Sequence, residues 1–163
     1  NWGINKVTDV CAISSKVLEA ALKEKEGKMN EAIQLLKEAV AIEDNLNYTE
    51  PPDWFFSVRH ALGSLLLTTG DYVQAEKIYK EDLFYWAKNG FALSGLAESL
   101  ASQGKTKEAE EVRAQFAEAW KYADTELKNS VVDPEKLKNV ALRIDKTSPN
   151  MLVFLSSSIC ITR

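Results

Sequence analysis

Apolar residues recur along this chain at spacings of three and four residues, in segments that run into a glycine. Apolar residues at this spacing lie on one face of an α-helix, so each segment predicts an amphipathic helix. A second segment with helical spacing follows after a tight turn, and the pattern therefore predicts helix hairpins. The positions that show it best are Val58, Leu62, Leu65 and Leu66 before Gly70, and Leu93, Leu96 and Leu100 before Gly104.

The hairpins repeat at a fixed period. Leu62, Gly70 and Ala75 return 34 residues later as Leu96, Gly104 and Ala109. An earlier copy is visible at Gly27 and Ala32, but Gly27 lies 43 residues before Gly70, so nine extra residues fall near positions 47–52. Glycine permits the positive φ that ends a helix, and alanine five residues later lets two helix backbones approach closely. We expect hairpins at about residues 5–47, 51–87 and 89–125.

These residues resemble the signature of the tetratricopeptide repeat (TPR) family. The signature residues are Leu62, Gly63, Gly70, Tyr72, Ala75 and Tyr79 in the best copy, Leu96, Gly104 and Ala109 in a looser copy, and Gly27 and Ala32 in the first. The EPPDW sequence at residues 50–54 and the repeats after it are also similar to a group of bacterial-type TPR proteins. The resemblance covers residues 17–120 and implies an all-α fold, a right-handed α-solenoid of about three hairpins. Asp82 departs from the family pattern, which usually has a small apolar residue there.

The last part of the chain has a different pattern. Residues 1–127 are predicted to form the repeat domain, and Asp133 suits the N-cap of a helix that caps this domain within residues 128–145. The tail, residues 146–163, contains an apolar run that begins at Met151. Three structures are open for this tail: a strand packed on the last repeat, a hook that binds a partner, and an end that does not pack.

Composition argues against most catalytic and metal sites. Two cysteines and one histidine, His60, in 163 residues oppose a disulfide scaffold, a thiolate zinc site and imidazole-based catalysis. Gly104-Lys105-Thr106 is like the end of a phosphate-binding loop, but the first glycine of such a loop is absent and the three residues lie in a repeat turn. We therefore expect no catalytic residue, no metal and no cofactor.

Charge limits the partners. With 20 basic and 24 acidic residues the net charge is −4, which opposes binding to nucleic acid or to an anionic membrane surface. The longest apolar run is about half of the roughly 20 residues that cross a bilayer. Charged pairs at helical spacing, such as Glu76 with Lys80, are expected on solvated outer faces. We expect a cytoplasmic location. The first residue, Asn1 rather than Met, leaves an upstream region open, and the oligomeric state is open as well.

Stacked hairpins place the first helix of each pair on an inner curved surface, where residues not used in packing line a groove. The candidates are Ser57, His60, Ala61, Ser64, Leu67, Phe91, Ser94, Gly95 and Glu98. This lining is small and mostly neutral, and it suits a peptide that inserts apolar side chains. We predict a non-catalytic protein–protein interaction module that binds a peptide or partner segment. The alternative is an accessory or substrate-presenting domain of a larger enzyme whose catalytic region lies outside this chain.

Overall fold

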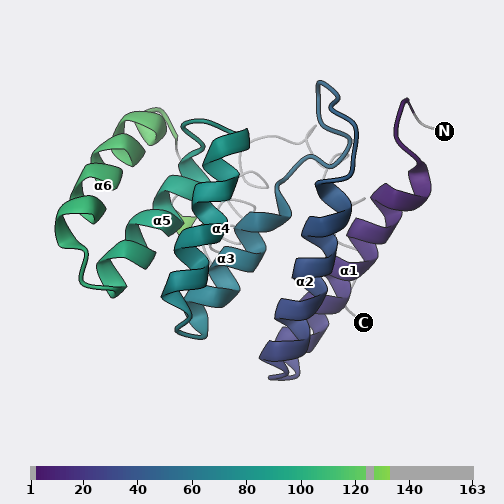
Figure 1. The fold of residues 1–163 in the computed structure, drawn as a ribbon, viewed down its shortest axis with the longest axis horizontal. Helices are drawn as coiled ribbons and strands as arrows, with labels where there is room; N and C mark the ends of the chain where they lie inside the picture. The colour runs from purple at the N-terminus through teal and green to yellow at the C-terminus, as the bar shows by residue number, and fades with distance from the viewer. Residues whose placement is uncertain (1–2, 124–126, 133–163) are drawn as a thin grey trace, which may run out of the picture. The chain divides into compact units, whose positions relative to one another are not determined.

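The computed structural model describes residues 3–123 and 127–132. Two short strands in these ranges, β1 (Leu127–Lys128) and β2 (Val131–Val132), form a two-stranded sheet. The other regular elements there are helices, so the prediction of a helical fold class is confirmed for the described part of the chain. They are α1 (Val7–Lys25), α2 (Met29–Glu43), α3 (Val58–Thr68), α4 (Tyr72–Tyr85), α5 (Gly90–Ser102) and α6 (Thr106–Trp120), labelled in Figure 1. None of these six has both the length and the apolar character that a membrane crossing requires.

Residues up to Ala123, together with Asn129–Val131, form one compact unit that contains these helices. Within this unit each helix packs against the next one in the chain, from α1 with α2 to α5 with α6. The helices follow one another across Figure 1 in chain order. Helix α3 also contacts α5, so the first helices of two successive hairpins are neighbours.

The three turns within the hairpins have the same local structure. Gly27, Gly70 and Gly104 have φ angles of +76°, +82° and +77°, in the left-handed region that favours glycine. In each turn, the N–H group that follows the glycine donates to a carbonyl oxygen five residues earlier, over 2.9 to 3.0 Å, as in a Schellman motif. These pairs are Lys28 with Lys23, Asp71 with Leu66, and Lys105 with Leu100. One helix therefore ends and the next begins in the same way three times.

Small residues bring the helices close together. The alanines five residues after the glycines are fully buried: Ala32, Ala75 and Ala109. Tyr79 on α4 is also fully buried, with its ring against the backbones of α3 and α5. A Cβ atom built on Gly63 or Gly95 would overlap this ring. Because Gly63 and Gly95 have no side chains, the ring of Tyr79 fits against both helices and packs the second hairpin against the third.

The prediction that Glu76 lies on a solvated outer face is wrong. The sequence predicts a solvated carboxylate, but the residue is only 9% exposed. It accepts hydrogen bonds from Lys105 at 2.6 Å, Lys80 at 2.5 Å and Gln103 at 2.7 Å. The hydrogen bond from Lys105, followed by that from Lys80, lowers the pKa of Glu76 to about 2. Lys105 belongs to the Gly104-Lys105-Thr106 turn, whose sequence is like the end of a phosphate-binding loop. Its bond to Glu76 therefore links this turn of the third hairpin to α4.

Strands occupy the first residues of the range 128–145, within which a capping helix is predicted to begin at Asp133. Lys128 belongs to β1, and β2 follows at Val131–Val132. Asn129 between them has a φ of +57°, which reverses the chain and does not fit a right-handed helix. The rest of that range, residues 133–145, and the tail 146–163 lie outside the described residues.

Candidate functional site

A cavity of about 460 Å³ lies where the α2–α3 connection meets the α4–α5 connection. We call it the aromatic cavity, after the side chains of Trp54, Phe55, Phe56, Tyr85, Trp86 and Phe91 that line it. Three of the predicted groove residues come together in its lining: Ser57, His60 and Phe91. Phe55 is 82% exposed, so an aromatic ring stands at this cavity in contact with solvent.

His60 is held in place beneath the cavity and is only 3% exposed. Its Nε2 lies 3.1 Å from Oδ2 of Asp82 and 2.9 Å from the amide nitrogen of Asn89. Asn89 donates to the same oxygen over 3.0 Å and accepts from the N–H group of Phe91 at the start of α5. Asp82 is fully buried and is the shared partner of His60 and Asn89.

Ring contacts fix the wall of the cavity. The ring of Phe91 stacks on that of His60, with centroids 5.4 Å apart. Phe56 meets both rings edge to face, at 4.8 Å from His60 and 4.9 Å from Phe91. Phe91 also contacts Trp120 edge to face, at 5.1 Å. Such aromatic pairs add to the stability that their burial gives, and they hold a preformed wall.

The other predicted groove residues are divided between surface and core. Ala61, Ser64 and Ser94 are partly exposed, and Glu98 is exposed. Leu67 is a correction, because it is 6% exposed and belongs to the hydrophobic core. Gly95 is a second correction: it is buried under the ring of Tyr79, so its role is packing. His60 and Ser57 are buried as well, although both line the aromatic cavity.

A segment beyond the helices contacts α3 and α4 through Ser130. Ser130 is fully buried, and its hydroxyl group donates to the backbone carbonyl oxygen of His60 over 2.6 Å. The hydroxyl group of Tyr79 lies 2.7 Å from Oγ of Ser130 and supplies the proton of that second hydrogen bond. Burial raises the pKa of Tyr79 well above its ordinary value, so the phenol keeps its proton. No pattern in the sequence indicates this contact, which joins residues 51 and 70 positions apart in the chain.

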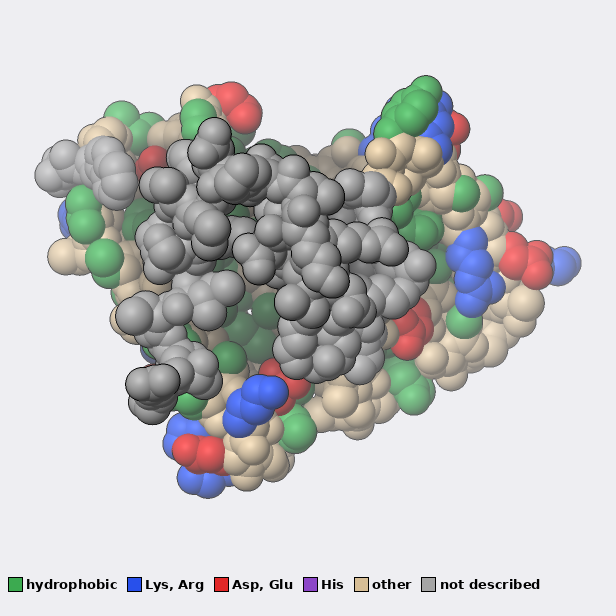
Figure 2. Space-filling model, turned by 180° about the vertical axis from the view of Figure 1, so that it is seen from behind, with side chains coloured by type: hydrophobic (Ala, Val, Ile, Leu, Met, Phe, Trp, Pro, Cys, Tyr) green, Lys and Arg blue, Asp and Glu red, His purple; other side chains and the backbone are tan. Residues whose placement is uncertain are grey.

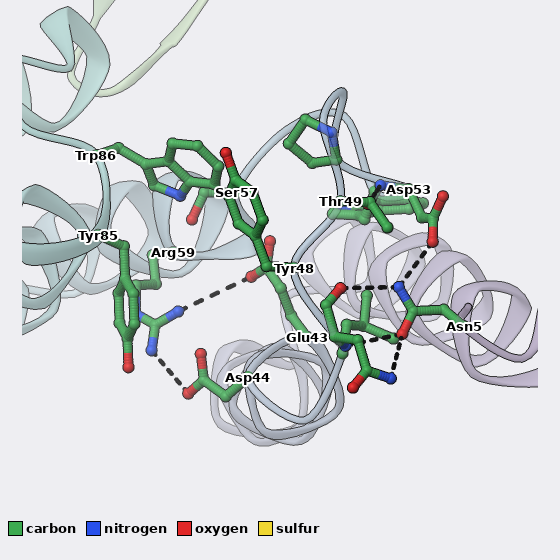
Figure 3. A pocket seen from close by; sticks show the side chains of 14 residues that line it. Asn5, Glu43, Asp44, Tyr48, Thr49, Asp53, Ser57, Arg59, Tyr85 and Trp86 are labelled. Atoms are coloured by element: carbon green, nitrogen blue, oxygen red, sulfur yellow. Dashed lines mark hydrogen bonds and ion pairs between the residues drawn. The ribbon is translucent and has the colours of Figure 1, made fainter. Parts of the chain in front are cut away.

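A second cavity, of about 220 Å³, adjoins the first (Figure 3). We call it the acidic cavity, after Glu43, Asp44 and Asp53 in its lining. The two cavities share Glu43, Pro52, Trp54, Ser57, Tyr85 and Trp86. The α2–α3 connection that forms one wall is held by Asn5, which donates to Oδ2 of Asp53 over 2.7 Å and accepts from the backbone N–H of Asn47, also over 2.7 Å.

Arg59 is the cation of the acidic cavity, and only 5% of it is exposed. Its guanidinium group donates to Asp44 over 2.7 Å, lies 3.9 Å from Glu43, and stacks over the ring of Tyr85 at 5.2 Å. Glu43 accepts from the N–H group of Val58 over 3.1 Å, at the first turn of α3. Burial raises the pKa of Glu43 to about 7. Sequence reasoning missed this cluster, because nothing in the spacing of these residues indicates that α2 meets α3 there.

Within the described residues there is no group of three or more histidine, cysteine, aspartate or glutamate side chains placed to hold a metal ion. Comparison of the sequence with protein-family models gave no match, and comparison with curated proteins gave no significant match.

Proposed function

We propose that this chain is a non-catalytic protein–protein interaction module of the TPR type, a right-handed solenoid of about three hairpins that binds a partner segment on its inner face. The equivalent turns at Gly27, Gly70 and Gly104 support the repeat, since helix pairs joined by identical turns stack in the same way. The contact between α3 and α5 supports an inner face built from first helices. The expected partner is a protein or peptide, because the net charge of −4 opposes nucleic acid and anionic membranes.

The aromatic cavity is the observation that carries this proposal. Its volume of about 460 Å³ lies within the range of about 300–1,000 Å³ that is typical of binding pockets. Its wall is preformed, because Phe91, His60 and Phe56 fix one another. An apolar side chain of a partner would bury the exposed ring of Phe55 as well as its own surface, and this burial favours association.

Ser130 supports the same proposal from within the chain. Its segment, Asn129–Val131, meets the helices at His60 and Tyr79 through two hydrogen bonds. The helices therefore already bind a short non-helical segment of the same chain, and a partner segment would bind helices in a comparable way. Figure 2, seen from behind, shows charged side chains mainly toward the margins of the visible face.

Two phenylalanines give a matched test. Phe55 at the aromatic cavity is 82% exposed, and Phe84 on α4, outside the cavity, is 84% exposed. Peptides are selected from a random linear library with the full chain, and their dissociation constants are measured by calorimetry for Phe55→Ala and Phe84→Ala. We expect Phe55→Ala to weaken binding about tenfold, which is about 1.4 kcal/mol, and Phe84→Ala to leave it unchanged. Equal effects of the two substitutions, or no selected peptide, would contradict the proposal.

A further inference from the structure

We propose that the acidic cavity binds a lysine or arginine side chain of the same partner segment whose apolar side chain enters the aromatic cavity. This inference rests on the proposed function, because the occupant is a segment of a bound protein. Three observations point to such an occupant: the charge of the lining, the exposed rings around it, and buried donor groups that have no partner.

The lining carries more negative than positive groups. The carboxylates of Glu43, Asp44 and Asp53 line the cavity together with one guanidinium group, that of Arg59. Arg59 is already paired with Asp44 over 2.7 Å. Asp53 accepts a hydrogen bond from the uncharged amide of Asn5 and makes no ion pair within the described residues. A cationic side chain of a partner would therefore meet a carboxylate whose charge is not yet compensated.

Aromatic rings surround the same cavity and remain in contact with solvent. Tyr48 is 75% exposed, Tyr85 59% and Trp86 40%. The faces of such rings attract cations, and the site already shows this geometry, with the guanidinium carbon of Arg59 5.2 Å from the centroid of Tyr85. Figure 3 shows the ring of Tyr85 beside Arg59, with Tyr48 and Trp86 also in the lining. A second cation would use ring surface that Arg59 leaves uncovered.

Two buried donors in the lining have no hydrogen-bond partner among the described residues: Nε1 of Trp54 and Nε of Arg59. A carboxylate oxygen of Glu81 lies 3.9 Å from Nε of Arg59, beyond hydrogen-bond distance. A buried donor without a partner is costly, so a ligand that supplies an acceptor gains affinity by pairing it. Backbone carbonyl oxygens of a bound segment are such acceptors.

A basic peptide segment meets these requirements together. Its side-chain cation suits the carboxylates and rings, and its backbone carbonyl oxygens suit the donors of Trp54 and Arg59. A metal ion would offer no acceptor to these donors, and a neutral saccharide would offer no charge. Because the two cavities share six lining residues, one segment is able to place an apolar side chain in one and a cation in the other.

The experiment uses the full chain and the library-selected peptides. Each arginine in a selected peptide is replaced by citrulline, which has nearly the same shape but no charge, and each lysine by norleucine. We expect the neutral peptides to bind about tenfold more weakly. We also expect the indole N–H resonance of Trp54 to move downfield with the cationic peptide, as a new hydrogen bond to that group requires.

Substitutions on the protein provide the matched control. Tyr48 at the cavity and Tyr122 outside it are 75% and 91% exposed, so neither substitution removes a core side chain. Tyr48→Ala should weaken the cationic peptide at least fivefold, and Tyr122→Ala should not. Selected peptides without lysine or arginine, or equal binding of charged and neutral peptides, would overturn this inference and leave the proposed function standing. Failure to select any peptide would overturn both.

Discussion

The ring of Tyr79 fills the space that a side chain on Gly95 would need. Since Tyr79 is fully buried and its hydroxyl group is hydrogen-bonded to Ser130, the ring has little room to move aside. The same ring also excludes a Cβ atom at Gly63. One aromatic residue on α4 thereby fixes how closely α3 and α5 approach.

Gly95→Ala should therefore destabilise the fold, although alanine has the higher helix propensity. Overpacking of this kind costs about 1–3 kcal/mol in the free energy of unfolding. Ser94→Ala, one position earlier on the same helix and partly exposed, is the control and should cost less than about 0.5 kcal/mol. Urea unfolding followed by circular dichroism measures both. A Gly95→Ala chain as stable as the unsubstituted protein would show that Tyr79 does not occupy this position.

The lowered pKa of Glu76 predicts that the folded chain loses stability in acid. Its pKa falls from 4.5 to about 2 on folding, so its contribution is fully present above pH 4.5 and is lost as the pH falls toward 2. We expect Glu76→Gln to cost about 1–2 kcal/mol at pH 7 and much less near pH 2. Thermal melts of the two proteins over this pH range test it. A constant difference between them would mean that the ion pairs with Lys80 and Lys105 do not contribute.

The raised pKa of Glu43 predicts the opposite trend, a loss of stability as the pH rises. Burial raises its pKa from 4.5 to about 7, so between these values the folded chain binds more protons than the unfolded chain. The contribution of Glu43 to the free energy of unfolding therefore falls as the pH rises through this interval. Glu43→Gln keeps an acceptor for the N–H group of Val58 and removes the titration. From pH 5 to pH 8 the wild type should lose about 1–3 kcal/mol more than this variant. Parallel stability curves would contradict the burial of an ionisable carboxyl group there.

Ser130→Asp predicts a gain in affinity for selected peptides. A carboxylate has no place between the hydroxyl of Tyr79 and the carbonyl oxygen of His60, so the segment should leave this face. His60 also lines the aromatic cavity, so loss of this segment would free surface next to the cavity for a bound peptide, and we expect binding about threefold tighter or more. Ser102→Asp, at an exposed position at the end of α5, is the control. Unchanged affinity in the Ser130 variant would place the peptide elsewhere.

The ends of the first helices could be predicted from the sequence, because they depend on the backbone conformation of single residues. Gly27, Gly70 and Gly104 end helices because only their backbone takes that φ cheaply, and this needs no knowledge of the partners. In the first hairpin the small buried residue of α1 is Ala20, whereas Leu18 is 52% exposed. Ala20 lies seven residues before its glycine, as Gly63 does before Gly70.

The site depended on contacts that spacing does not encode. His60 was expected on the groove surface, but its pairing with Asp82 and Asn89 places it beneath the aromatic cavity. The unusual Asp82 was the one sequence signal for a buried polar partner. Arg59 and Glu43 come together only because α2 packs against α3 across a long connection, which residue patterns along each helix do not specify.

Nuclear magnetic resonance mapping of a selected peptide on the full chain tests the central claim most directly. With backbone and indole N–H groups assigned, the account predicts that the largest shifts fall on Trp54, Trp86, Asn89 and Phe91, around the aromatic cavity. It predicts little change at Glu110 and Glu111, which are exposed on α6. Shifts concentrated on α6 or on the outer face of α4, with the cavity residues unmoved, would contradict it.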